Sequence, residues 1–234
     1  MTGSLKLLCF DLDDTLWPCA ATISAAEHKL YRWMQQTVPE ITVAHDNESL
    51  RKKRIAFWNA HPELGHDLSK MRLASMHALA DEFGLAHDWV EPGFELYYQA
   101  RQQVSLFADV APALDELSER YRLAAVTNGN ADIHLTQVAH WFEFAISAAA
   151  VGKAKPHRDF FTAIQSRAGL DFAEIVVIGD DPERDIVGAS QHGMRTVWVN
   201  REQTGWNHDT CEPDAVVTDF GQLADMLRQL EAAE

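Results

Sequence analysis

Short apolar runs alternate with amphipathic stretches from about residue 107 to the end of the chain. The runs are Leu123–Val126, Phe144–Ala150, Ile175–Ile178, Thr196–Val199 and Ala215–Val217. Strands of a parallel sheet are buried on both faces, so they form continuous runs of small and β-branched residues. The pattern therefore predicts an α/β fold of βαβ units around a parallel sheet. Leu7–Phe10 has the same character and is expected to be the first strand.

Residues 18–106 follow a different pattern, in which apolar residues recur at helical spacing. This pattern predicts four helices, at about 22–37, 48–60, 68–83 and 89–104, with breaks near Pro39, Pro62 and Gly84. No segment in this stretch has the character of a strand. We therefore expect an α/β core formed by residues 1–17 and 107–234, interrupted by a helical insert at 18–106.

Composition and charge narrow the class of protein. Hydrophobic residues make up 47% of the chain and charged residues 24%, as in ordinary globular proteins and unlike disordered or collagen-like chains. The net charge of −15 argues against nucleic acid or anionic membranes as partners. The three cysteines show no CxxC spacing, which favours a reducing compartment. We expect a cytoplasmic protein that is either a monomer or a homodimer.

The acidic excess is unevenly distributed. Residues 18–106 hold 11 of the 35 acidic and 9 of the 20 basic side chains, a net charge of −2, which leaves −13 for the rest of the chain. The predicted core is therefore strongly acidic, and the predicted insert is almost neutral.

Three carboxylates, those of Asp11, Asp13 and Asp14, directly follow the first predicted strand. Carboxylates at the end of a buried strand are costly unless they hold a cation or do chemistry. Side chains alternate in extended chain, so Asp11 and Asp13 point the same way. This arrangement suits one carboxylate as nucleophile and metal ligand and the other as general acid and base. The alternative is a turn that caps a helix.

Two further strand ends carry groups suited to binding phosphate. After the strand that ends at Val126, Thr127 offers a hydroxyl, and the small residues beyond it offer backbone N–H groups. Lys155 precedes Pro156 and a helix expected to begin near Arg158, where it can bring positive charge to a phosphoryl group. An ordinary turn and a surface lysine are the respective alternatives.

A second acidic cluster follows the strand that ends at Ile178. Asp180 and Asp181 come directly after Gly179, and Asp185 lies five residues beyond Asp180. Oxygen ligands grouped in this way suit Mg²⁺, although a capped helix is an alternative. In open α/β sheets, ligands bind at the carboxyl ends of the strands. The four clusters therefore predict a single active site.

The motif set resembles that of the haloacid dehalogenase superfamily of phosphotransferases, over nearly the whole chain. The matching motifs are Asp11-Leu12-Asp13-Asp14-Thr15, Thr127, Lys155, and Gly179-Asp180 with Asp185. The resemblance implies a Rossmann-like core with a C1-type helical cap. It also implies that Asp11 attacks phosphorus to form an aspartyl phosphate. The resemblance further implies that Asp13 protonates the leaving alcohol in this step and later activates the hydrolytic water.

Further roles are implied by the same resemblance. Mg²⁺ is expected on the Asp11 carboxylate, the Asp13 backbone carbonyl and Asp180. Phosphoryl oxygens are expected on Thr127 and on the amide of Asn128.

Three more side chains complete the expected set. The resemblance implies that Lys155 neutralises the nucleophile and the phosphate. It gives Asp185 the task of orienting water or Lys155, with Asp181 as a less specific supporting residue.

The substrate expected from the resemblance is a small phosphorylated metabolite. The dehalogenase branch lacks an acid at the position of Asp13, so the Asp11-x-Asp13 pair favours phosphoester hydrolysis. The overall pattern is similar to bacterial C1-capped phosphatases that act on flavin mononucleotide and on a phosphorylated riboflavin precursor. Trp17, next to the catalytic loop, is a candidate for stacking on such a ring, with core packing as the alternative.

Three other functions stay open at this point. A 2-haloacid dehalogenase and a phosphomutase belong to the same superfamily. A phospho-accepting receiver domain in signalling also groups aspartates, a threonine and a lysine around Mg²⁺. The insert after the first strand and the Asp11-x-Asp13 pair on that strand argue against a receiver domain.

Overall fold

The computed structural model describes residues 5–232, which divide into two compact units. The α/β unit comprises the chain up to Pro18, Ser105–Gly129, and the chain from Gln137 onward. The helical unit comprises Cys19–Val104 together with Asn130–Thr136, a segment that lies between the second and third strands in the sequence.

Six parallel strands form the sheet of the α/β unit, in the order β3-β2-β1-β4-β5-β6. They are β1 Leu7–Phe10, β2 Arg122–Thr127, β3 Phe144–Ser147, β4 Ile175–Gly179, β5 Arg195–Val199 and β6 Ala215–Val217. This arrangement confirms the predicted α/β, Rossmann-like fold. Phe10 at the end of β1 lies opposite Ala125 of β2 and Ile178 of β4. β2 continues two residues beyond this level and β4 one residue, so the carboxyl ends of the three strands lie at the same edge of the sheet.

One predicted strand is too long. The apolar run Phe144–Ala150 was expected to be extended throughout, but β3 ends at Ser147. The Ser147 hydroxyl accepts a hydrogen bond from the backbone N–H of Ala150, at 3.2 Å, and so caps a short helix over Ala148–Val151. The alanines in this run have high helix propensity, and the serine cap decides where the helix begins.

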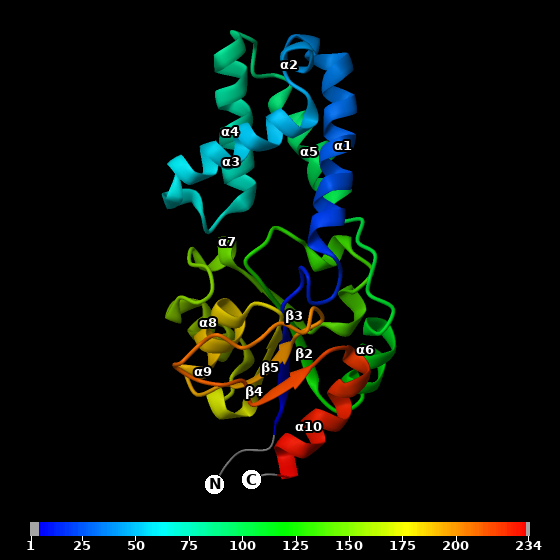
Figure 1. Cartoon of the computed structure of the whole chain (residues 1–234), viewed down its shortest axis with the longest axis vertical. Coiled ribbons are helices and arrows are strands. Elements are labelled where there is room, and N and C mark those ends of the chain that lie inside the picture. Colours follow the sequence, from blue (N-terminus) through cyan, green and yellow to red (C-terminus); the bar gives the residue numbers. More distant parts are fainter. Residues whose placement is uncertain (1–4, 233–234) are drawn as a thin grey trace. The chain divides into compact units, whose positions relative to one another are not determined.

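Helices cover both faces of the sheet (Figure 1). They are α6 Val110–Ser118, α7 Ala148–Val151, α8 Arg158–Ala168, α9 Gly188–Ser190 and α10 Leu223–Ala232, with short helical turns η3 Ala139–Trp141, η4 Phe172–Glu174, η5 Pro182–Val187 and η6 Phe220–Gln222. Leu7 and Cys9 face α8 and α9, where Phe160 and Phe161 complete the core. On the opposite face, the Phe10 ring lies 5.8 Å from that of Phe220, beside α6 and α10.

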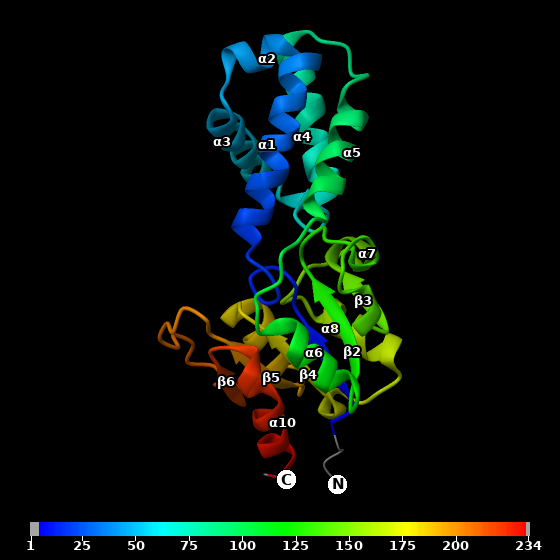
Figure 2. The same ribbon diagram turned by 90° about the vertical axis from the view of Figure 1, so that its right-hand side faces the viewer.

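The helical unit contains five α-helices where the sequence predicts four (Figure 2). They are α1 Cys19–Thr37, α2 Pro39–Ala44, α3 Asn47–Ala60, α4 Leu68–Phe83 and α5 Val90–Arg101, with short turns η1 Pro62–Leu64 and η2 Ile133–Leu135. Pro39 was expected only to break the chain, but it also begins α2, because proline suits the first helical position. α1 and α5 pack closely against each other. A Cβ at position 93 on α5 would lie only 2.9 Å from the Trp33 side chain on α1, and Gly93 avoids this clash.

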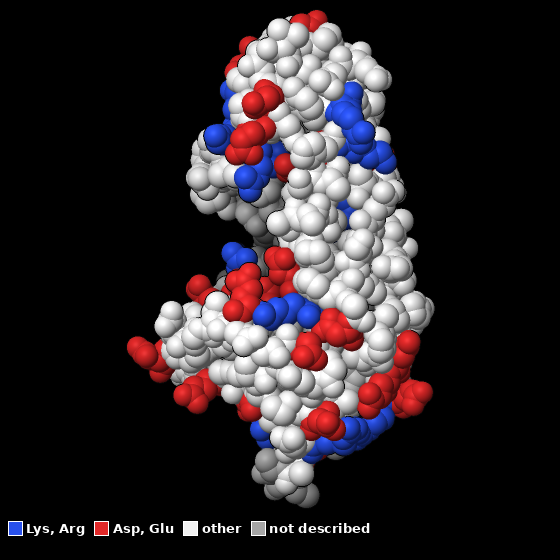
Figure 3. Space-filling model, turned by 45° about the vertical axis from the view of Figure 1, so that its right-hand side comes forward, with Lys and Arg blue, Asp and Glu red and all other residues white. Residues whose placement is uncertain are grey.

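Acidic side chains are spread over the visible face of the α/β unit (Figure 3). The visible face of the helical unit has large areas without charge, and it carries both acidic and basic side chains. Among residues 5–232, no helix combines the length and apolar character needed to span a bilayer.

Candidate active site

Lys155 lies at the centre of a buried charge cluster in the α/β unit. Its Nζ donates to Asp11 Oδ1 at 2.7 Å, to Asp185 Oδ1 at 2.6 Å and to the carbonyl of Val126 at 3.0 Å. Burial opposes the charge on the lysine, but Asp11 and Asp185 outweigh it and hold the pKa of Lys155 above its ordinary value. The amine is therefore a fixed ammonium ion with all three protons directed at acceptors.

The backbone of Lys155 is held by the side chain of Asn128. The Asn128 amide group donates to the Lys155 carbonyl at 2.9 Å, and its oxygen accepts from the Lys155 N–H at 2.8 Å. Asn128 was predicted to bind phosphate through its backbone amide, a role that remains a prediction. The side chain joins the end of β2 to the lysine, a positioning role that the sequence pattern did not indicate.

Asp185 packs directly against Gly179 at the end of β4. A Cβ added to Gly179 would lie 2.3 Å from Asp185 Oδ2, so only glycine leaves room for the carboxylate. Asp185 Oδ2 also accepts from the Asp181 N–H at 3.2 Å. The Asp181 side chain accepts from the N–H groups of Glu183 and Arg184 and caps the helical turn η5. Asp185 is thus placed to position Lys155, and Asp181 fixes the turn that carries Asp185.

Asp180 lies beside Asp11 and is fixed from two sides. The Thr15 hydroxyl donates to Asp180 Oδ1 at 2.7 Å, and the Trp198 indole donates to the Asp180 carbonyl at 2.9 Å. Burial is the main cause that raises the pKa of Asp180 to about 7. Neither Thr15 nor Trp198 was predicted from the sequence to have a role in the site. The position of Thr15, four residues after Asp11, could have indicated a role in the site. No sequence pattern could have indicated Trp198, because its contact with Asp180 depends on the register of β4 and β5.

The carboxylates of Asp11, Asp180 and Asp185 can each place an oxygen within 4.8 Å of the others. Within residues 5–232, no other group of three potential metal-binding side chains meets this criterion. When all three carboxyl groups are ionised, they exceed the one ammonium ion by two negative charges, which a divalent cation would neutralise. The oxygen-only donor set suits Mg²⁺. The Asp13 carboxylate is not part of this group, and a contribution from its backbone carbonyl remains a prediction.

Asp13 and Trp17 form a pair on the loop after β1. The Trp17 indole N–H donates to Asp13 Oδ1 at 2.9 Å, and the backbone N–H of Asp14 donates to the Trp17 carbonyl at 2.8 Å. Trp17 is fully buried, whereas Asp13 is partly exposed. Stacking on a substrate needs an accessible ring face, and Trp17 presents none here. Its observed contact is with the carboxylate of Asp13.

Thr127 ends β2 and is buried. Its hydroxyl oxygen accepts a hydrogen bond from the Gly129 N–H at 2.8 Å, which closes the loop after the strand. The structure thus brings Thr127 to the same edge of the sheet as Asp11 and Asp180. Lys155 does not end a strand, but its side chain reaches Asp11 from the loop between α7 and α8.

The model for haloacid dehalogenase-like hydrolases matches residues 5–193. The chain belongs to the haloacid dehalogenase-like hydrolase family. The family assignment confirms the resemblance carried by the motifs, and it favours a hydrolase over a receiver domain.

Several characterised proteins are similar to this hydrolase over most of their length. One is the 5-amino-6-(5-phospho-D-ribitylamino)uracil phosphatase YigB of Escherichia coli strain K12, 29% identical over 86% of this chain and 85% of the relative. Another is the pyrimidine 5'-nucleotidase PynA of Streptococcus pneumoniae strain R6, 29% identical over 95% of this chain and 94% of the relative. A solved structure of a 2-haloacid dehalogenase from Pseudomonas syringae pv. Tomato DC3000 is 33% identical, with a TM-score of 0.88 over 97% of this chain and 99% of that one.

Proposed function

We propose that this hydrolase is a Mg²⁺-dependent phosphatase that cleaves the monoester of a small phosphorylated metabolite through an aspartyl phosphate on Asp11. The observation that carries the proposal is the second carboxylate, that of Asp13, which Trp17 fixes two residues after the nucleophile. An alcohol is a poor leaving group unless it is protonated, and Asp13 can provide that proton. The names of the phosphatase relatives support the same reaction.

The first step transfers the phosphoryl group to Asp11. Lys155 holds Oδ1 of this carboxylate at 2.7 Å, and Oδ2 attacks phosphorus in line with the leaving oxygen. The P–O ester bond breaks as Asp13, in its acid form, donates a proton to the departing alkoxide. A divalent cation bound by Asp11, Asp180 and the Asp13 carbonyl would supply positive charge to the phosphoryl oxygens.

The second step hydrolyses the aspartyl phosphate. Asp13, now a carboxylate, takes a proton from water, whose oxygen attacks phosphorus and releases inorganic phosphate and Asp11. Lys155, the Thr127 hydroxyl and the backbone amide of Asn128 stabilise the charge on the phosphoryl oxygens in both steps. Asp185 acts through Lys155, whose Nζ it holds at 2.6 Å.

Substrate selection is assigned in this proposal to the helical insert, residues 18–106, acting as a cap on the core formed by 1–17 and 107–234. The nearly neutral charge of the insert is compatible with a phosphorylated substrate. The first compounds to test are flavin mononucleotide and 5-amino-6-(5-phospho-D-ribitylamino)uracil.

A phosphate-release screen over phosphorylated metabolites, with and without Mg²⁺, tests the proposal. We expect turnover only with the cation, and a loss of about 10⁴-fold or more in kcat for Asp11→Asn. Absence of phosphate release from every phosphoester would overturn the proposal, and near-normal turnover by Asp11→Asn would reject the nucleophile. Conversion of a sugar phosphate without phosphate release would identify a phosphomutase instead.

Dehalogenation of a 2-haloacid is the second candidate, favoured by the similarity to the Pseudomonas syringae structure. Halide leaves without a proton, so this reaction does not need the Asp13 carboxyl group. Chloride release from 2-chloropropionate, undiminished in Asp13→Asn, would support dehalogenation. Phosphate release that depends on Asp13 would support the phosphatase.

A further inference from the structure

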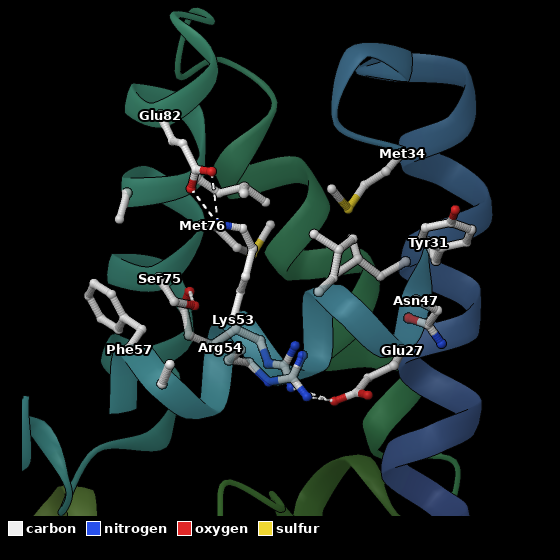
Figure 4. A pocket seen from close by; sticks show the side chains of 16 residues that line it. Glu27, Tyr31, Met34, Asn47, Lys53, Arg54, Phe57, Ser75, Met76 and Glu82 are labelled. Atoms are coloured by element: carbon white, nitrogen blue, oxygen red, sulfur yellow. Dashed lines mark hydrogen bonds and ion pairs between the residues drawn. The ribbon is translucent and has the colours of Figure 1, made fainter. Parts of the chain in front are cut away.

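The helical unit contains a cavity of about 320 Å³ between α1, α3 and α4 (Figure 4). Its walls combine apolar side chains, among them Met34, Phe57 and Met76, with a small group of charged ones. A cavity of this volume lies at the lower end of the range for small-molecule sites, which are mostly apolar with a few convergent polar groups.

The charged side chains of the cavity do not balance. Arg54 and Arg72 both donate to the same oxygen, Oε1 of Glu27. The other two charges, Lys53 and Glu82, pair with each other at 2.8 Å. Three cationic groups therefore line the cavity against two carboxylates, a surplus of one positive charge.

The surplus lies in a region largely closed to solvent. Arg72 and Glu27 are buried, and the side chain of Arg54 is 14% exposed. Nε of Arg54 is buried and meets no hydrogen-bond acceptor among the described residues. Burial, followed by the nearby charge of Arg72, lowers the pKa of Arg54 to about 10. A buried guanidinium that shares its only carboxylate is costly unless another anion accompanies it.

We propose that this cavity binds a small organic monocarboxylate, with its carboxylate on Arg54 and its apolar body among Met34, Phe57 and Met76. A single negative charge cancels the surplus, whereas a phosphate dianion would leave an uncompensated negative charge in a poorly solvated site. The planar guanidinium also matches the geometry of a carboxylate. The apolar walls provide burial for an aliphatic or aromatic chain.

The site is separate in sequence from the proposed catalytic residues. Every residue that lines the cavity falls between Glu27 and Glu82, and none belongs to the proposed catalytic set. The inference therefore does not depend on the phosphatase proposal, and a binding measurement can fail without affecting it.

Titration calorimetry on the full chain tests the charge requirement with three eight-carbon probes. We expect sodium octanoate to bind, 1-octanol to bind at least about tenfold more weakly, and octylammonium not to bind, because only the carboxylate completes the charge balance. Equal affinity for octanoate and octanol, a preference for octylammonium, or no octanoate binding would each overturn the proposal. Tighter binding of inorganic phosphate than of octanoate would also do so.

A pair of variants on α3 locates the site. Arg54→Met removes the surplus charge but leaves Glu27 paired with Arg72 at 3.2 Å, so the unit retains a balanced pair. Arg51→Met is the matched control, since Arg51 lies on the same helix, is 54% exposed and does not line the cavity. Octanoate affinity should fall at least about tenfold in Arg54→Met and stay unchanged in Arg51→Met. Equal effects of the two variants would contradict the assignment.

Glu27→Gln provides a test in the opposite direction. It raises the surplus to two positive charges, so octanoate should raise the melting temperature of this variant more than that of the unmodified chain. A smaller rise, with the variant folded, would contradict the proposal. If Glu27→Gln does not fold, the comparison of octanoate with octanol on the unmodified chain still decides the question.

Discussion

Each unit of this hydrolase buries a cluster of charged side chains, and the two clusters are unbalanced in opposite directions. In the α/β unit, Lys155 pairs with the carboxylates of Asp11 and Asp185, and a third carboxylate, that of Asp180, lies in the same group. In the helical unit, Arg54 and Arg72 share the carboxylate of Glu27. An uncompensated charge is costly inside a protein, so the sign of each surplus indicates the ion that would complete the cluster. A bound cation would compensate the negative surplus in the α/β unit, and a bound anion would compensate the positive surplus in the helical unit.

The comparison also separates two kinds of residue within each cluster. Lys155 and Glu27 are the minority charges, because each one compensates two or more groups of opposite sign. Asp180 and Arg54 belong to the majority. Removing a minority charge leaves all its partners uncompensated, whereas removing a majority charge brings the cluster closer to balance.

The largest expected effect follows from loss of the minority charge in the α/β unit. Lys155→Met leaves the buried carboxylates of Asp11 and Asp185 without an ammonium partner, so we expect a loss of about 3–5 kcal/mol in the free energy of unfolding and little phosphatase activity. Arg54→Met, which removes a majority charge, should cost less than about 1 kcal/mol. Urea unfolding monitored by circular dichroism measures both. Similar losses in the two variants would break the distinction between minority and majority charges.

The next effect concerns the cation expected in the α/β unit. Mg²⁺ that binds only the folded chain should raise its stability by about 2.7 kcal/mol at a concentration one hundred times Kd. Asp180→Asn should abolish this increase, because it removes one of the three grouped carboxylates. Asp181→Asn is the matched control, since Asp181 caps the turn η5 and is not in the group. Thermal unfolding with Mg²⁺ and with EDTA gives the measurement, and an equal response of both variants would reject the site.

The geometry of the cluster can be tested without changing any charge. Gly179→Ala places a Cβ where Asp185 Oδ2 now lies, so the carboxylate must move away from Lys155. We expect a loss of about 1–3 kcal/mol in stability and a fall in kcat of about tenfold or more. Gly205→Ala is the control, because a Cβ there meets nothing within 4 Å. If Gly179→Ala keeps full activity, Asp185 does not position Lys155.

The carboxylates of the α/β cluster could be predicted from the sequence because Asp11 and Asp180 directly follow strands. Asp11 directly follows the apolar run of the first strand, and Asp180 follows the glycine that ends β4. Parallel strands bring such positions to one edge of the sheet. The Asn128–Lys155 clamp was not predictable, because it joins loops 27 residues apart through side-chain geometry.

The helical unit was predictable only as helices. Periodicity marks which residues of a helix are apolar, but it does not tell which charges of different helices meet. Glu27 and Arg54 lie 27 residues apart on α1 and α3, and Arg72 lies on α4. In the sequence, Arg54 ends a basic run that is typical of a solvated helix face, and only the packing of three helices buries it.

The smallest expected effect tests a neutral donor beside the charged cluster of the α/β unit. Trp17→Phe keeps a buried aromatic ring but removes the N–H that holds Asp13 Oδ1 at 2.9 Å. Water can replace this donor, because Asp13 is partly exposed, so we expect a stability loss of only about 1 kcal/mol.

The same variant should affect catalysis according to the leaving group. A general acid that is held less firmly slows the reaction most when the leaving group is strongly basic. The kcat on an alkyl phosphate should therefore fall about tenfold, and that on p-nitrophenyl phosphate should fall less. Asp13→Asn should show the same preference with larger losses. Equal losses on the two substrates in Trp17→Phe would show that the indole supports the loop without positioning Asp13 for proton transfer.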